Sequence, residues 1–146
     1  MRKIITGAVA AVLGVSAVVA SGAFAGGNGA QRSGLSPQAG DNNSQCVAGS
    51  GAGTNGFAIV NAPGQPGNAR FVNGEVSLKR GAADSAYTVW LATDSSNCMP
   101  AGVLTTNTVG NGNAHLDNAG TSGTYYVVLQ DDQGNEQFAT APVTAN

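Results

Sequence analysis

The chain has 146 residues, of which 42% are hydrophobic and 10% are charged, and its formal net charge is −2 at pH 7. This length suits one domain with a single core. Because Arg2 and Lys3 account for two of the six basic residues, four basic residues face eight acidic ones in the rest of the chain. That balance opposes nucleic-acid binding, which needs clustered Lys and Arg.

The N-terminus has the three parts of a secretory signal. A basic start is followed by an apolar run over residues 4–20 and by the small-x-small sequence Ala23-Phe24-Ala25. The run contains two glycines, is short for a membrane span and has no basic flank after it. We therefore expect residues 1–25 to be a cleaved signal peptide. The protein would then be secreted, extracellular or periplasmic, with no membrane association afterwards.

Residues 26–53 are rich in Gly, Asn, Ser, Gln and Ala. Such a segment buries too little apolar surface to offset its ordering entropy, so we expect a flexible leader. The chain has two cysteines, Cys46 and Cys98. In an exported protein an isolated pair predicts one disulfide, which would tie the leader to the domain and contribute about 4 kcal/mol in the chain-entropy model.

Residues 54–146 are expected to form one β domain. Short β-branched and aromatic runs alternate there with clusters of Gly, Asn, Asp and Pro, as strands alternate with turns. The expected strands span residues 56–61, 69–79, 85–93, 103–108, 113–118, 124–130 and 136–144. No stretch after residue 26 has capped helical periodicity, so almost no helix is expected.

About seven short strands favour an all-β fold, a single antiparallel Greek-key sandwich of immunoglobulin-like type. An eight-stranded barrel is the alternative. Asn73-Gly74 predicts either a hairpin turn or a bulge within residues 69–79. Residues 133–135 predict the turn that joins the last two strands.

Three segments carry a resemblance. Residues 76–78 (VSL), 86–91 (AYTVWL) and 123–129 (GTYYVVL) resemble the strand pattern of small exported bacterial immunoglobulin-like domains of unassigned function. The resemblance covers residues 56–144 and implies a fold but no reaction. The chain also resembles the copper/zinc superoxide dismutase or chordin-repeat sandwich, but the histidine cluster of that enzyme has no counterpart here, so its activity is not implied.

Groups that could perform catalysis are sparse. A zinc site needs three or four converging ligands, whereas His115 is the single histidine. Cys98 and His115 would act as nucleophile and base only with a free thiol. The chain has no nucleophile elbow, phosphate loop or dinucleotide fingerprint. We expect no enzyme activity, no metal site at His115 and no cofactor.

One acidic turn is a candidate calcium site. Asp131, Asp132, Asn135 and Glu136 bring four oxygen-bearing side chains to one turn, and calcium prefers oxygen ligands. A polar hairpin turn explains the same residues, and their spacing matches no calcium loop.

Trp90 and Tyr126 form a candidate binding surface. In the alternating pattern of residues 85–93, Trp90 lies on the opposite strand face from Tyr87, Val89 and Leu91. Trp90 either packs inside the domain or over the disulfide, as in immunoglobulin domains, or it stands exposed with Tyr126 and offers a flat apolar surface to a sugar or protein.

The leading hypothesis is a secreted, non-enzymatic binding or interaction module that contacts an extracellular protein or glycan through loops at one end of the domain. A self-assembling matrix or surface protein is the alternative, because the apolar run over residues 125–129 would be adhesive at a sheet edge. The third hypothesis is an enzyme inhibitor whose exposed loop, residues 95–101, is pinned by Cys98.

Overall fold

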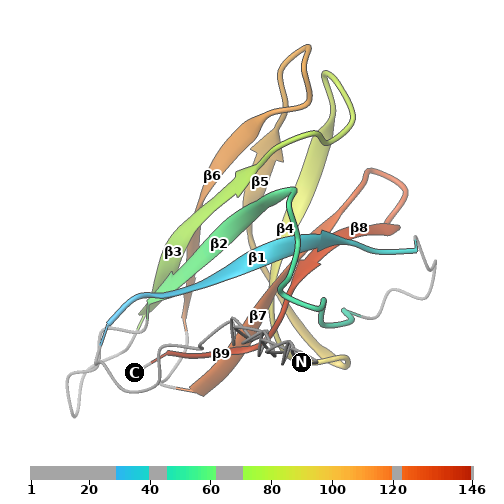
Figure 1. The fold of residues 1–146 in the computed structure, drawn as a ribbon. Helices are drawn as coiled ribbons and strands as arrows, with labels where there is room; N and C mark the ends of the chain where they lie inside the picture. Colours follow the sequence, from blue (N-terminus) through green and yellow to red (C-terminus); the bar gives the residue numbers. More distant parts are fainter. Residues whose placement is uncertain (1–28, 40–45, 62–70, 120–122, 146) are drawn as a thin grey trace, which may run out of the picture.

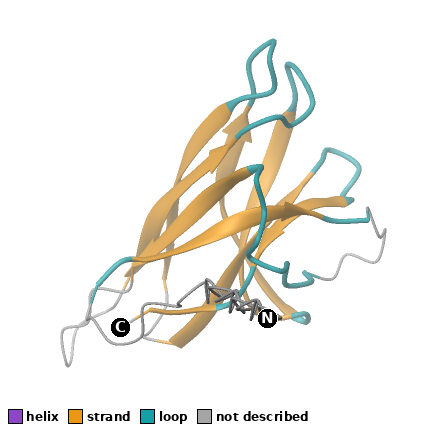
Figure 2. Cartoon of the chain, in the orientation of Figure 1, coloured by secondary structure: helices purple, strands orange, loops and turns teal. Residues whose placement is uncertain are grey.

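The computed structural model describes residues 29–39, 46–61, 71–119 and 123–145. Within these ranges, nine antiparallel strands form one sheet that curves into a nearly closed barrel (Figure 1), and there is no helix (Figure 2). The strands are β1 (Gln31–Pro37), β2 (Gly56–Asn61), β3 (Phe71–Leu78), β4 (Ala86–Asp94), β5 (Asn97–Thr105), β6 (Gly112–Ala119), β7 (Gly123–Gln130), β8 (Glu136–Thr140) and β9 (Val143–Ala145). The expected signal peptide, residues 1–25, lies outside the described residues.

The order of strands around the barrel is β5-β4-β7-β8-β1-β2-β3-β6, and β9 pairs with the start of β7. The loop over residues 106–111 joins β5 to β6, which lie side by side and bring the two ends of the sheet together. Across this seam the Asn118 side-chain amide donates to the Pro100 carbonyl at 2.9 Å. Because β7 returns beside β4, strands β4 to β7 follow a Greek-key path.

The all-β antiparallel prediction is confirmed, but the sheet is a single barrel-like one and not a clear two-sheet sandwich. The reason is β1. Residues Gln31 to Gly34 pair with β2, and residues Leu35 to Pro37 pair with β8, so one strand connects the two halves of the sheet. The eight-stranded barrel alternative is therefore closer to the structure than the immunoglobulin-like sandwich.

Strand β1 lies in the segment that we expected to be a flexible leader, and that expectation is wrong for residues 29–39 and 46–53. Leu35 is fully buried in the barrel core. The glycines of this segment allow close packing: a Cβ on Gly53 would come within 1.5 Å of the Leu35 carbonyl oxygen. Small residues here let backbone pack against backbone, so the glycine-rich composition did not indicate disorder.

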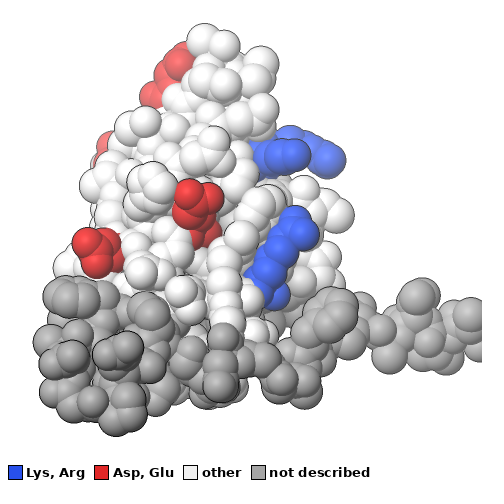
Figure 3. All heavy atoms as spheres, turned by 90° about the vertical axis from the view of Figure 1, so that its left-hand side faces the viewer, with Lys and Arg blue, Asp and Glu red and all other residues white. Residues whose placement is uncertain are grey.

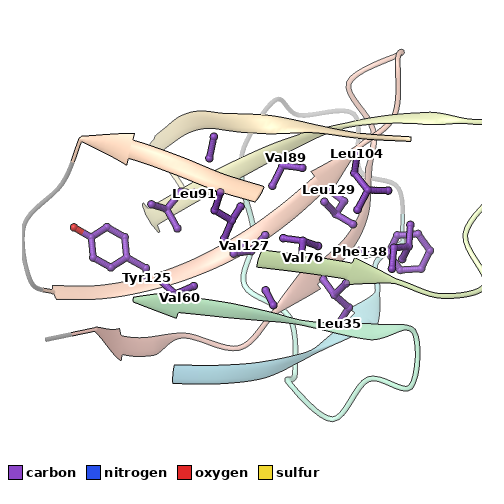
Figure 4. Close-up of a cluster of buried hydrophobic side chains, with 14 of the residues drawn as sticks. Leu35, Val60, Val76, Val89, Leu91, Leu104, Tyr125, Val127, Leu129 and Phe138 are labelled. Atoms are coloured by element: carbon purple, nitrogen blue, oxygen red, sulfur yellow. The ribbon is translucent and has the colours of Figure 1, made fainter. Parts of the chain in front are cut away.

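The barrel interior holds the main hydrophobic core (Figure 4). The predicted alternation along β4 is confirmed, because Tyr87, Val89 and Leu91 point into this core whereas Trp90 and Ala92 belong to a second cluster outside the barrel. Ten core residues are labelled in Figure 4: Leu35, Val60, Val76, Val89, Leu91, Leu104, Tyr125, Val127, Leu129 and Phe138.

Two strands and one dipeptide differ most from the expectation. Strand β5 begins at Asn97, six residues before the expected start, and contains a register shift opposite Val89 and Trp90. The expected strand over residues 136–144 divides into β8 and β9 at Ala141 and Pro142. Asn73-Gly74 forms neither turn nor bulge, since β3 runs through it in unbroken register. Gly74 is required there because a Cβ would lie 1.8 Å from the Ile59 carbonyl oxygen.

We predict that Leu35→Ala destabilises the protein by about 2–5 kcal/mol, the range for deleting a buried leucine side chain. Urea unfolding followed by circular dichroism measures the change. Val103→Ala is the control, because Val103 is 65% exposed and its truncation should cost less than about 0.5 kcal/mol. Equal stability of Leu35→Ala and Val103→Ala would contradict the role given to β1.

Candidate functional site

Three loops extend from one end of the barrel, and we call them together the loop end. They are residues 79–85 between β3 and β4, residues 106–111 between β5 and β6, and residues 131–135 between β7 and β8. Figure 1 shows the first two side by side at the top and the third lower and to the right, next to β8. Loops on a rigid barrel are the usual place for binding residues.

Backbone hydrogen bonds join the first two loops to each other. The Gly81 amide donates to the Gly110 carbonyl at 2.8 Å, and the Asp84 amide donates to the Asn107 carbonyl at 3.1 Å. Within the second loop, the Asn107 carboxamide oxygen accepts from the amides of Val109 and Asn111. The two loops therefore form one hydrogen-bonded unit.

Thr106 lies at the base of this unit and is 8% exposed. Its hydroxyl accepts from the Ser85 amide at 2.9 Å and donates to the Ala82 carbonyl at 2.6 Å. The Ala82 amide in turn donates to the hydroxyl of Tyr87, whose ring lies in the barrel core. These bonds connect the loop end directly to the folded interior.

Two residues of the 79–85 loop, Arg80 and Asp84, have positive φ values of 59° and 48°. Non-glycine residues adopt this left-handed conformation at a cost, and it persists where neighbouring bonds determine it. The Asp84 amide bond to Asn107 and the Arg80 amide bond to the Asn111 side chain supply those constraints. The loop is thus held in one conformation.

The third loop is organised by Asp131. One carboxylate oxygen accepts from the amides of Gln133 and Asn135 at 2.9 and 2.8 Å, and the other accepts from the side chains of Asn135 and Gln137 at 3.0 Å each. The Gly134 amide closes the predicted turn onto the Asp131 carbonyl, and Gly134 has a φ of 78°. The turn predicted over residues 133–135 is confirmed.

Burial raises the pKa of Asp131, but hydrogen bonds from Asn135, Gln133 and Gln137 outweigh it and hold the pKa below its ordinary value of 3.8. A carboxylate that accepts several N–H groups is stabilised in its charged form. Asp131 is therefore ionised at neutral pH and is engaged by amides.

A hollow lies between the first and third loops. Its lining comprises Ala82, Asp84, Ser85, Ala86, Tyr87, Asp131, Asp132 and Gln137. Three carboxylates give it an acidic character, and Ser85 and Gln137 add hydrogen-bonding groups. Outside this lining, Val109 of the 106–111 loop exposes 67% of its surface and is an apolar side chain of the loop end. This arrangement suits a cationic or hydrogen-bond-donating group beside a small apolar surface.

The four candidate calcium ligands do not converge. Asp131 and Asn135 bond to each other, but the Glu136 carboxylate accepts from the Val47 amide at 2.8 Å and is buried elsewhere. Among the described residues, no three His, Cys, Asp or Glu side chains gather closely enough to hold a metal ion.

Trp90 and Tyr126 lie outside the barrel under residues 46–53, which we call the strap. Their cluster also contains Val128 and Ala139, together with the predicted Cys46–Cys98 disulfide, which is confirmed with a Cα–Cα distance of 6.2 Å. Trp90 is half-buried and packs against the cluster that contains the disulfide. Its indole nitrogen is buried and has no hydrogen-bond partner in the described residues.

Tyr126 is 5% exposed, so its ring offers no open binding surface. Its hydroxyl donates to the Cys46 carbonyl at 2.8 Å. Burial, together with the negative charges of Asp94 and Glu136, raises the pKa of Tyr126. Tyr126 therefore acts as an anchor for the strap.

His115 lies on the outer face of the barrel with 86% of its side chain exposed, where its Nδ1 is 3.5 Å from a carboxylate oxygen of Glu75 on the neighbouring strand. Figure 3 shows the side of the molecule that includes β3 and β6, with acidic and basic side chains in separate places and uncharged surface between them. A pair this exposed contributes little to stability.

No family model, no curated protein and no solved structure matches this chain. Within the described ranges, no helix has the length and apolar character to cross a membrane. The disulfide fits an oxidising location, extracellular or periplasmic, because cytosolic reductants keep thiols reduced.

Sequence reasoning identified the Asp131 turn but missed Asp84 and Thr106. The short spacing of Asp131 and Asn135 is a visible turn signal. Thr106 bonds to residues 21 and 24 positions away, and no local pattern marks such a partner.

We predict that Thr106→Val lowers the free energy of unfolding by about 1–3 kcal/mol, because it leaves the Ser85 amide and the Ala82 carbonyl without their partner. Chemical denaturation measures this. The neighbouring Thr105→Val, at an exposed position, should change stability by less than about 0.5 kcal/mol. Similar free energies of unfolding for both variants would show that the hydrogen bonds of Thr106 contribute nothing to stability.

A second prediction concerns pH. A carboxyl whose pKa is lowered by folding stabilises the fold above its unfolded pKa, and this contribution is lost as pH falls through the lower folded pKa. Wild type should therefore exceed Asp131→Asn in melting temperature at pH 7, and the gap should shrink as pH falls below the ordinary value of 3.8. Asp132→Asn, at an exposed neighbouring position, should lower the melting temperature at pH 7 by less than Asp131→Asn does. A melting-temperature difference between wild type and Asp131→Asn that stays constant with pH would refute the stabilising role of the ionised Asp131 carboxylate.

Proposed function

We propose that this chain is a secreted, non-enzymatic binding module that contacts its partner with the loop end. The observation that carries the proposal is the hydrogen bonding between the 79–85 and 106–111 loops, which fixes both before any partner arrives. Loops that are ordered in advance lose less conformational entropy on binding, so more of the contact energy appears as affinity.

The chemistry of the loop end favours a partner with a basic side chain. Asp84, Asp131 and Asp132 line the hollow, and Val109 exposes an apolar side chain nearby. A lysine or arginine of an extracellular protein would place its charge by the carboxylates and its aliphatic stem along the adjoining surface.

Secretion is part of the proposal. The basic start, apolar run and small-x-small ending of residues 1–25 support export. The Cys46–Cys98 bond supports the same compartment, since such bonds persist where the environment is oxidising.

The position of β7 weighs against self-assembly. The apolar run over residues 125–129 would be adhesive only at an edge, whereas β7 pairs with β4 on one side and with β8 and β9 on the other. The inhibitor hypothesis requires an exposed loop over residues 95–101. Residues 97–101 belong to β5 and only a tight turn precedes them, which weighs against that hypothesis.

The test measures binding of the exported full chain by surface plasmon resonance. Peptides with a central Lys or Arg are compared with the same peptides carrying Met, and cell-wall glycans form a second panel. We expect saturable binding of the basic peptides and at least about tenfold weaker binding by Asp132→Lys.

Glu75→Lys is the matched control, because it makes the same charge change at a 64% exposed side chain away from the loop end. Its affinity should stay within about twofold of wild type. No saturable binding tighter than about 1 mM, or an equal loss in both variants, would overturn the proposal. Saturable binding of glycans alone would overturn the choice of a basic partner.

A further inference from the structure

The strap covers a surface that would otherwise be exposed. Cys46 and Ala48 pack against the outer cluster of Trp90, Tyr126 and Val128 on β4 and β7, and the strap then follows β8 and reaches β1 at Ser36. The strap contributes little apolar surface to that cluster: Cys46 is fully buried and Ala48 is partly buried, whereas Val47 is 49% exposed. Its own side chains therefore add little to the apolar area that is buried when it covers Tyr126 and Val128.

Polar contacts of the strap are few. The Val47 amide donates to Glu136, the Gly49 amide to the Thr140 carbonyl at 2.8 Å, and the Ser50 amide to the Ser36 hydroxyl at 3.1 Å. The Tyr126 hydroxyl donates to the Cys46 carbonyl at 2.8 Å. Each such bond contributes only modestly, because on release of the strap both partners regain hydrogen bonds to water. The disulfide closes a separation of 52 residues, and in the chain-entropy model a loop of that length contributes more than any one of these hydrogen bonds. The covalent bond is thus the strongest single attachment.

The barrel core does not use the strap. The main hydrophobic cluster draws on the barrel strands and contains no residue between 46 and 53. Cys98 lies in β5 beside a hairpin turn that Asp94 closes independently, by accepting from the amides of Ser96 and Asn97 at 2.8 and 3.0 Å. Neither the core cluster nor these hairpin bonds involve a cysteine side chain.

We propose that the Cys46–Cys98 bond is a redox latch, whose reduction releases the strap from the outer face of β4, β7 and β8 while the barrel stays folded. Local opening of this kind requires a segment with few contacts of its own, beside a core that is stable without it. The reductant is an extracellular dithiol, either a small molecule or a thiol oxidoreductase.

The two sulfur atoms differ in access. Cys46 is 0% exposed, whereas Cys98 is only partly buried. A thiolate of the reductant therefore attacks the Cys98 sulfur, forming a mixed disulfide and expelling the Cys46 thiolate, which takes a proton from water. The second thiol of the reductant then attacks the reductant's other sulfur atom, the one bonded to Cys98 in the mixed disulfide, and releases Cys98. Two electrons pass to the protein, and the dithiol becomes a disulfide.

Hydrogen exchange with dithiothreitol tests the latch. On reduction, the amides of Val47, Gly49 and Ser50 should exchange at least about 100-fold faster, whereas those of β2 and β3 should change by less than about twofold. Cys46→Ser with Cys98→Ser should reproduce this pattern without reductant. Tyr126→Phe, which removes one strap contact and keeps the disulfide, should leave the strap amides protected in the oxidised protein.

Two results would overturn the latch. Unchanged protection of the strap amides after reduction would show that the strap stays bound without the disulfide. Faster exchange throughout β2 and β3 would show that the bond maintains the whole fold. The order of attack has its own test: after brief treatment with glutathione, mass mapping should find the adduct on Cys98 in at least about tenfold excess over Cys46, and an excess on Cys46 would refute the proposed step.

Discussion

The barrel depends on the double pairing of β1. Its first residues, Gln31 to Gly34, extend the sheet of β2, β3 and β6, and its last residues, Leu35 to Pro37, extend the sheet of β8, β7, β4 and β5. Without this strand the two halves would share no ladder. One buried side chain, Leu35, fixes which face of β1 turns inward, because a shift of one residue would move it out of the barrel core to the opposite face of the strand.

Closure of the sheet also determines the loop end. Once β1 connects the halves, β5 and β6 approach each other, and the loops over residues 79–85 and 106–111 leave the barrel next to one another. Their mutual hydrogen bonds follow from this proximity, with Thr106 at the centre. The candidate binding surface is therefore a consequence of the strand order, although no single segment of the sequence encodes it.

Local sequence patterns predicted the strands but not how the strands assemble. Alternation in β4 and β7, and the turn at Asp131, depend on neighbouring residues and were predictable. Strand β1 was missed because its pairing uses backbone groups, which composition does not reveal, and because its side chains are mostly small. The choice between sandwich and barrel rests on that strand, and Thr106 acts through partners distant in sequence. Neither the choice of a barrel nor the role of Thr106 could be obtained from hydrophobic periodicity.

Strand β7 explains why the protein has two apolar clusters. Its side chains from Tyr125 to Gln130 are buried on both faces, so a barrel alone would leave Tyr126 and Val128 in water. A cover is needed, and the strap supplies it with small residues that fit closely: a Cβ on Gly49 would lie 2.2 Å from the Ala139 carbonyl oxygen. Small residues bury little area of their own, so the same fit leaves the cover dependent on hydrogen bonds and the disulfide. The small residues of the strap thus explain both its close packing and the small apolar area that its own side chains bury.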